Sequence, residues 1–141
     1  MKRLRHWWPF LLVATGLFVT SSLPGDSLPP PDLGEDFLFG WMARNTDKVF
    51  HALVYSVLGW FSLRGFTQSG ARPLTGRLAF FAVLVTAAYG ASDEFHQSFV
   101  PLRTCALDDW VADTFGGLLA ASVAFLLRWR ARRRTAISVP P

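Results

Sequence analysis

Apolar runs of nearly membrane-spanning length alternate with short polar segments along this chain. The runs cover residues 7–23, 49–63, 78–91 and 109–129. A helix that crosses the hydrocarbon core of a bilayer needs about 20 mostly apolar residues. The third run reaches that length only if its helix continues through residues 93–97, and Pro101 ends any such helix. The pattern predicts an all-α integral membrane bundle of about four transmembrane helices.

The first run permits two interpretations. It follows Lys2, Arg3 and Arg5 and ends among small residues, as a cleaved signal peptide does. Its apolar length is closer to that of a spanning helix, which favours a retained helix. A loop rich in proline and acidic residues follows at residues 24–45.

The fourth run carries a face of small residues, namely Gly116, Gly117, Ala120 and Ala121. Small residues let the backbones of two membrane helices approach closely, so we expect another helix to pack here. One transmembrane domain is expected over residues 1–129. Residues 130–141 are expected to form a basic, disordered cytoplasmic tail.

The distribution of charge predicts an orientation. Lysine and arginine gather at the N-terminus, in the connection of residues 64–77 and after residue 127, whereas the acids gather in the other two connections. Because basic residues favour the cytoplasmic side, both termini of this multi-pass membrane protein are expected in the cytoplasm. The lipid bilayer is then the main partner.

Composition excludes other classes of protein. Only 17% of the residues are charged, against roughly a quarter in a soluble domain. The net charge of +4 comes from basic residues that flank apolar runs instead of converging on a soluble surface, which argues against nucleic acid as a partner. Cys105 is the single cysteine, so the chain has no intramolecular disulfide and no cysteine-based zinc site.

Polar residues recur at helical spacing within three of the predicted spans. The stripes are Asp47, His51, Tyr55 and Gly59; Thr86, Tyr89, Asp93 and Gln97; and Asp109 with Asp113. The predicted topology brings all three stripes to one membrane face, the non-cytoplasmic one. Ionisable side chains at membrane depth cost several kcal/mol unless they are paired or hydrated, so these residues are functional candidates.

Each residue also has a plainer explanation. Asp47 and Asp109 are suitable N-caps, and the side chain of Lys48 is long enough to reach the membrane interface. A lone histidine such as His51 is more often a hydrogen-bonded packing residue than a ligand. His96 is expected to face away from the stripe of its helix. Asp113, one turn inside a span, is the hardest to explain as part of the surface.

Three motifs in order resemble the VanZ-like proteins. They are Asp47-Lys48-x-x-His51-x-x-x-Tyr55, then Tyr89-Gly90-x-x-Asp93-Glu94-x-x-Gln97, and then Arg103 followed by Asp109-x-x-x-Asp113-x-x-Gly116. The motifs lie within residues 47–119. The resemblance implies a role in the cell envelope and in tolerance to the glycopeptide antibiotic teicoplanin, without specifying a reaction.

Two positions depart from the usual pattern of that family. Asp113 stands where asparagine is more common, which adds a negative charge. Leu102 stands where a Pro-Gly-Arg turn commonly has glycine, and this makes a turn with positive φ less expected here.

The motifs suggest a hypothesis for function. The hypothesis is a site that binds or acts on a lipid-linked or phosphorylated envelope component. Asp93, Glu94 and Asp109 are candidate ligands of a divalent cation, and His51 is a candidate general acid or base. Lys48 and Arg103 are candidates to bind phosphate, and Arg103 is alternatively a partner for the acids. The full set of candidate site residues is Asp47, Lys48, His51, Asp93, Glu94, Gln97, Arg103, Asp109 and Asp113.

Two other classes of function stay open at this point. The charged cluster of a non-enzymatic protein would fix the geometry of the bundle or bind a head group or antibiotic. Movement of protons or ions is the third class, and charges confined to one face make a continuous path harder to build. The sequence leaves open whether a reaction is catalysed.

Overall fold

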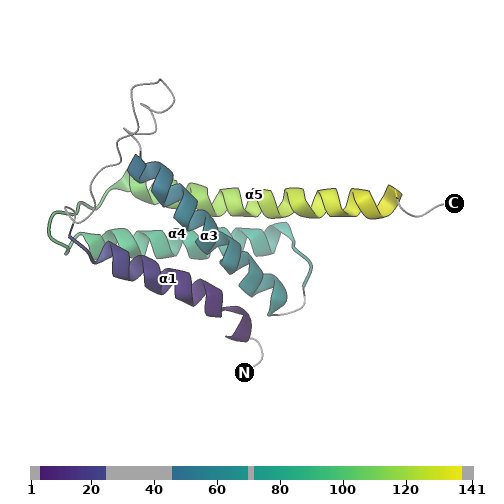
Figure 1. Ribbon diagram of the computed structural model, residues 1–141, viewed down its shortest axis with the longest axis horizontal. Helices are drawn as coiled ribbons and strands as arrows, with labels where there is room; N and C mark the ends of the chain where they lie inside the picture. The colour runs from purple at the N-terminus through teal and green to yellow at the C-terminus, as the bar shows by residue number, and fades with distance from the viewer. Residues whose placement is uncertain (1–3, 25–45, 70–71, 138–141) are drawn as a thin grey trace, which may run out of the picture.

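The computed structural model describes residues 4–24, 46–69 and 72–137, and all of its regular structure is helical. A 3-10 turn at Leu4–His6 precedes four α-helices (Figure 1). These are α1 (Trp8–Ser21), α3 (Thr46–Gln68), α4 (Gly76–Gln97) and α5 (Leu107–Ile137). The all-α prediction is therefore confirmed. The expected loop at residues 24–45 lies, apart from Pro24, outside the described residues.

Three of the helices are long and apolar enough to cross a membrane. Helices α3 and α4 have 23 and 22 residues, and α5 provides a span within Leu107–Arg134. Helix α1 is apolar but has only 14 residues, so it is shorter than a full span. The outer surfaces of the long helices expose large apolar side chains such as Phe50, Phe80 and Phe115. In water such a surface would drive aggregation, whereas lipid tails are its natural solvent.

Consecutive helices of the bundle run in alternating directions (Figure 1). The N-terminus of α3, the C-terminus of α4 and the N-terminus of α5 therefore meet at one end. The polar end of α4 belongs to the helix, as the sequence predicted, because α4 continues through Asp93 to Gln97. The first described residues and the free end of α5 both lie toward the opposite end of the bundle (Figure 1).

Helices α3 and α5 pack with their backbones in close contact. A Cβ atom added to Gly116 would lie 2.5 Å from the carbonyl oxygen of Ala52, and one added to Gly59 would lie 3.0 Å from the Cα of Gly117. Ala120 and Ala121 are buried beside them. The small-residue face predicted from the sequence is therefore the contact surface of α5. This packing fixes the relative height of the polar residues on the two helices.

Two helices are longer than the sequence predicted. Helix α3 continues beyond Leu63 to Gln68, and α5 continues beyond Trp129 to Ile137. The prediction of a disordered tail from Arg130 is thus wrong as far as Ile137. Arginine and alanine are good helix formers, and no proline or glycine interrupts the segment before Pro140. Arg133 also lies over the ring of Trp129 at 4.0 Å, which supports the extra turns.

Helix α1 packs against the other helices. The hydroxyl of Tyr89 on α4 donates to the carbonyl oxygen of Ala14, and the Trp7 ring lies edge-on to Phe66 of α3 at 4.9 Å. Gly65 leaves the space that the Trp7 ring fills. Helix α1 is therefore packed as part of the bundle in this structure.

Candidate functional site

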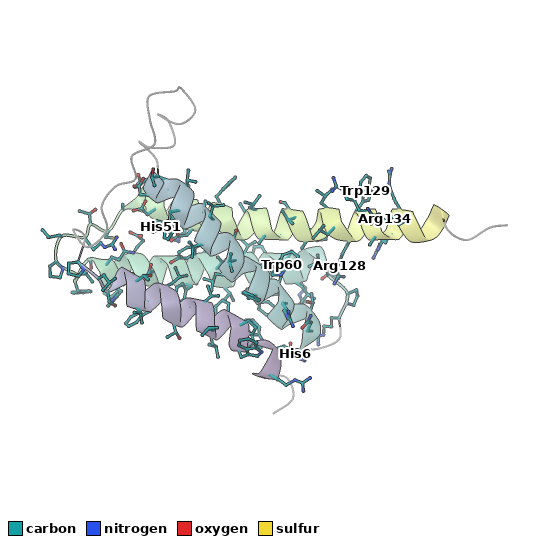
Figure 2. All side chains as sticks on the ribbon, in the orientation of Figure 1. His6, His51, Trp60, Arg128, Trp129 and Arg134 are labelled. Atoms are coloured by element: carbon teal, nitrogen blue, oxygen red, sulfur yellow. The ribbon has the colours of Figure 1, made fainter. Side chains whose placement is uncertain are left out.

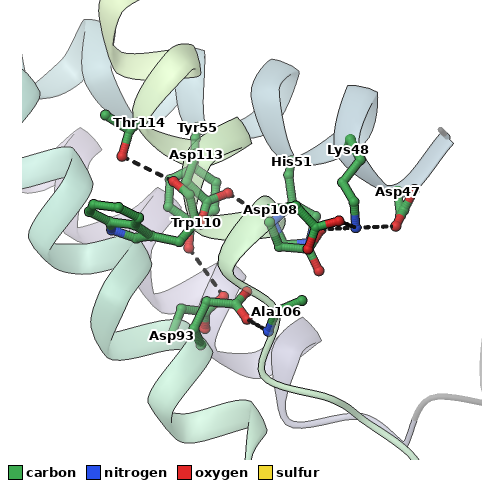
Figure 3. Close-up of polar contacts among 12 residues, drawn as sticks. Asp47, Lys48, His51, Tyr55, Asp93, Ala106, Asp108, Trp110, Asp113 and Thr114 are labelled. Carbon is green, nitrogen blue, oxygen red and sulfur yellow. Dashed lines mark hydrogen bonds and ion pairs between the residues drawn. The ribbon is translucent and has the colours of Figure 1, made fainter.

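Lys48 joins the starts of α3 and α5. Its Nζ atom lies 2.6 Å from Asp47 and 3.1 Å from Asp108, and it also contacts Asp109 (Figure 3). Asp108 and Asp109 are in the first turn of α5, where carboxylates interact favourably with the helix dipole. The lysine is therefore occupied by three carboxylates from two helices. Its charge is therefore paired, unlike that of an isolated lysine that reaches toward the membrane interface.

His51 forms a pair with Asp113 one turn deeper. The Nδ1 atom of His51 lies 2.8 Å from Oδ1 of Asp113, whose side chain is fully buried. Gly90 on α4 makes room for this carboxylate, since a Cβ atom there would lie 2.7 Å from Asp113 Oδ2. The contact at Nδ1 orients the imidazole ring and leaves Nε2 available for another partner.

Asp93 on α4 is held by neutral donors. Its Oδ2 atom accepts hydrogen bonds from the Tyr55 hydroxyl and from Gln97 Nε2, both at 3.1 Å. Tyr55 and Asp93 are each at least 95% buried. The network links α3 to α4 beneath the ion pairs of Lys48.

Glu94 connects α4 to the loop before α5. Its Oε2 atom accepts a hydrogen bond of 2.7 Å from the backbone N–H of Ala106, next to the first residue of α5 (Figure 3). The side chain is buried in spite of its charge. This bond sets the position at which α5 enters the bundle.

The acidic, basic and amide residues of the predicted stripes thus converge into one polar cluster together with Tyr55, whereas Gly59, Thr86 and Tyr89 pack elsewhere in the bundle. We use this name for Asp47, Lys48, His51, Tyr55, Asp93, Glu94, Gln97, Asp108, Asp109 and Asp113. Within the described residues, three buried oxygens of the cluster have no hydrogen-bond partner: Asp93 Oδ1, Glu94 Oε1 and Asp113 Oδ2. Six carboxyl groups face one lysine and one histidine, so the cluster carries an excess of negative charge.

Three possible metal ligands of the cluster lie close together. One ligand atom each from His51, Glu94 and Asp109 falls within 4.8 Å of the other two. The set predicted from the sequence was Asp93, Glu94 and Asp109. Among the described residues it is His51, and not Asp93, that joins the other two. Asp93 accepts hydrogen bonds from Tyr55 and Gln97 instead.

A comparison with known protein families identifies the family of this chain. The model of the VanZ/LLP1 family matches residues 7–128, which include α1, α3, α4 and most of α5. The chain belongs to the VanZ/LLP1 family. No curated protein and no solved structure matches the chain.

One residue of the VanZ-like motif does not join the cluster. Arg103 donates from Nε to the carbonyl oxygen of Leu23 at 3.2 Å, and it makes no ion pair with an acid of the described residues. The expected role of Arg103 as a partner for the clustered acids is therefore not seen. The turn before α5 directs its side chain toward the end of α1 instead.

That turn also corrects the expectation for Leu102. Its φ angle is 60°, in the left-handed region that glycine favours. The N–H of Arg103 donates to the carbonyl oxygen of Val100 at 3.2 Å, which closes the turn around Pro101 and Leu102. A turn with positive φ therefore forms with leucine at this position, and the hydrogen bond from Arg103 closes it.

His96 lies apart from the cluster, as the stripe of α4 predicted. Its Nε2 atom lies 2.9 Å from the hydroxyl oxygen of Ser22, and its ring stacks on Phe18 at 4.5 Å. The sequence did not single out Asp108 or the backbone N–H of Ala106. Asp108 was detectable as the neighbour of Asp109 at a helix start, whereas the bond of Glu94 to Ala106 depends on a loop path without a sequence signal.

Proposed function

We propose that this VanZ/LLP1 protein binds the head group of a lipid-linked or phosphorylated envelope component at the polar cluster. The cluster would face the extracytoplasmic side of the bacterial cytoplasmic membrane, and the protein would thereby raise tolerance to teicoplanin. The observation that carries this proposal is the set of three buried carboxylates that each retain one oxygen without a partner.

Such oxygens are costly in an apolar bundle. A buried polar atom without a partner costs on the order of 1–3 kcal/mol, and more when it is charged. Buried polar atoms that lack a partner therefore occur mainly at functional sites. A cluster that served packing alone would gain stability from pairing Asp93 Oδ1 and Glu94 Oε1, or from apolar residues in their place.

The pair of His51 and Asp113 provides reactive chemistry for this site. A buried carboxylate that accepts from Nδ1 orients the imidazole and favours its Nε2 as a proton acceptor. Nε2 of His51 then offers its lone pair beside the bound head group, either to a proton of a water or hydroxyl group or, when a cation is bound, to that cation. Asp113 acts through His51 and is therefore a positioning residue.

The test uses Asp93→Asn, which removes charge and keeps the shape of the side chain. The asparagine oxygen can still accept from Tyr55 and Gln97, so the protein should fold. Wild type and variant are expressed at matched membrane levels in a Gram-positive host, and tolerance to teicoplanin and to vancomycin is measured. Wild type should raise tolerance to teicoplanin selectively, and Asp93→Asn should not. Equal tolerance with both proteins, or no effect of wild type, would contradict the proposal.

A second candidate function is favoured by the contacts of Lys48. Because this one ammonium group holds Asp108 and Asp109 of α5 against α3, the cluster can be a clamp that fixes the bundle without chemistry. Lys48→Met separates the two candidates. For a clamp, tolerance should fall only in proportion to folded protein, as measured by the amount that remains monodisperse after extraction in detergent. For a working site, tolerance falls further than the folded fraction does.

A further inference from the structure

The proposed ligand and the charge of the cluster do not match. A phosphorylated head group is an anion, whereas the cluster contains six carboxyl groups. Of the two basic residues expected to bind phosphate, Lys48 is paired with three carboxylates, and Arg103 lies outside the cluster with its Nε bonded to the backbone of Leu23. A further positive charge is needed for an anion to bind here.

Three side chains converge where such a charge can be held. Ligand atoms of His51, Glu94 and Asp109 lie within 4.8 Å of one another, and they come from three different helices. Atoms that share a tetrahedral ion at about 2.1 Å lie about 3.4 Å apart, so small side-chain rotations bring them into range. Imidazole with two carboxylates is a donor set that suits Zn²⁺ or Mn²⁺ better than Mg²⁺ or Ca²⁺.

The surroundings of these three residues resemble those of known ligands. Metal-binding histidines usually bond through the second ring nitrogen to a carboxylate, and Nδ1 of His51 contacts buried Asp113 in this way. Glu94 is only 4% exposed, and its Oε1 has no partner while Oε2 is anchored on Ala106. Asp109 shares one oxygen with Lys48 and has a second one to offer.

We propose that His51, Glu94 and Asp109 bind one divalent transition-metal ion, Zn²⁺ or Mn²⁺, at the polar cluster. The ion occupies the space beside Glu94 Oε1 and reduces the negative charge of the cluster. It leaves Lys48 bound to Asp47 and Asp108. The inference deepens the proposed function by giving the head group a positive partner. The binding of metal is nevertheless measured without any head group, so the two proposals can fail separately.

The test measures metal in the full-length protein, purified in detergent with an affinity tag that lacks histidine. Bound metal is first removed with a chelator, and the protein is then incubated with Zn²⁺, Mn²⁺ or Mg²⁺ at micromolar free concentration. After desalting, the retained metal is measured by inductively coupled plasma mass spectrometry. Wild type should retain about one equivalent of Zn²⁺ or Mn²⁺ and no Mg²⁺. Glu94→Gln and His51→Gln should lose that equivalent. His96→Gln, a histidine outside the cluster, should keep it.

Thermal unfolding in the same samples guards against variants that do not fold. The added ion should raise the midpoint of wild type and of His96→Gln, and it should leave the midpoint of folded Glu94→Gln unchanged. If Glu94→Gln does not fold, Asp109→Asn takes its place, since Asp109 is partly exposed. Wild type without retained metal would overturn the proposal. Equal retention in wild type and in folded Glu94→Gln and His51→Gln would overturn it as well.

Discussion

At the scale of single residues, the cluster combines firm attachment with incomplete pairing. One oxygen of Asp93 is held by Tyr55 and Gln97, one of Glu94 by Ala106, and one of Asp113 by His51. In the described part of the chain, the other oxygen of each carboxyl group has no hydrogen-bond partner. The attached oxygen fixes the carboxylate in place. The other oxygen gives it the capacity to bind something that the chain itself does not provide.

Tyr55 tests the strength of this attachment. Tyr55→Phe removes one donor from buried Asp93, and a hydrogen bond to a charged group contributes about 1.5–3 kcal/mol. Tyr89→Phe is a matched control because its hydroxyl bonds to a neutral carbonyl oxygen, a bond that contributes about 0.5–1.5 kcal/mol. Denaturant titration in detergent should show the larger loss of unfolding free energy for Tyr55→Phe. A larger loss for Tyr89→Phe would contradict the firm attachment of Asp93 by Tyr55.

A substitution at Leu102 is expected to raise the free energy of unfolding instead of lowering it. A non-glycine residue at positive φ destabilises the folded protein by about 1–2 kcal/mol. Glycine removes this strain, but ordering its more flexible backbone on folding costs about 0.5–1 kcal/mol. Leu102→Gly should therefore raise the unfolding free energy by up to about 1 kcal/mol. Leu107→Gly changes a leucine of similar exposure, 75% against 73%, at the start of a helix and should lower it. Destabilisation by Leu102→Gly would contradict the strained turn.

At the scale of the helices, the sequence predicted which helices exist and in what order better than it predicted where each helix ends. The continuation of α4 to Gln97 followed from the minimum length of a span, and the contact face of α5 followed from Gly116 and its small neighbours. The extension of α5 to Ile137 was missed, because hydropathy detects where the apolar run stops and not where the helix stops. Figure 2 shows Arg134 on this extension and Arg128 and Trp129 just before it, far from His51 in the cluster.

Helix spacing predicted which residues gather in the polar cluster, but not which partners they have there. The four-residue repeats placed Asp47, His51 and Tyr55 on one side of α3, and the structure brings this side to α5 and α4. The direction of Arg103 was not predictable, since it depends on a turn with leucine at positive φ.

Gly116 provides a test of the contact between α3 and α5. In Gly116→Ala the new Cβ atom would lie 2.5 Å from Ala52 O and 2.8 Å from Ser56 N, and neither backbone atom can move without shifting α3. We expect a loss of about 1–3 kcal/mol in unfolding free energy, with lower tolerance because Lys48 and His51 lose their register with α5. Gly16→Ala meets no atom within 4 Å and should be neutral or stabilising. A neutral Gly116→Ala would contradict the close packing.

At the scale of the whole molecule, the ends of the bundle differ in charge. The polar cluster occupies one end, and the basic residues of the extended α5 project from the other (Figure 2). We propose that the basic end faces the cytoplasm, since lysine and arginine favour that side. Cys105 lies in the loop between α4 and α5, at the end with the cluster, and is exposed.

Cys105 reports this orientation directly. A membrane-impermeant maleimide should label it in intact cells, and Cys105→Ser should abolish labelling. Moving the thiol to the opposite end with Ser69→Cys in the Cys105→Ser protein should restrict labelling to permeabilised cells. Labelling of wild type only after permeabilisation would place the cluster on the cytoplasmic side and reverse the orientation.

Two histidines at the same end of the bundle, one inside the polar cluster and one outside it, test whether the cluster performs the function of this VanZ/LLP1 protein. His51 belongs to the cluster, and His96 contacts Ser22 and Phe18 at the end of α1. Teicoplanin tolerance is measured for His51→Gln and His96→Gln at equal membrane levels. We expect His96→Gln to give the tolerance of wild type and His51→Gln to give that of the empty vector. Full tolerance with His51→Gln, at a level of folded protein equal to wild type, would contradict it.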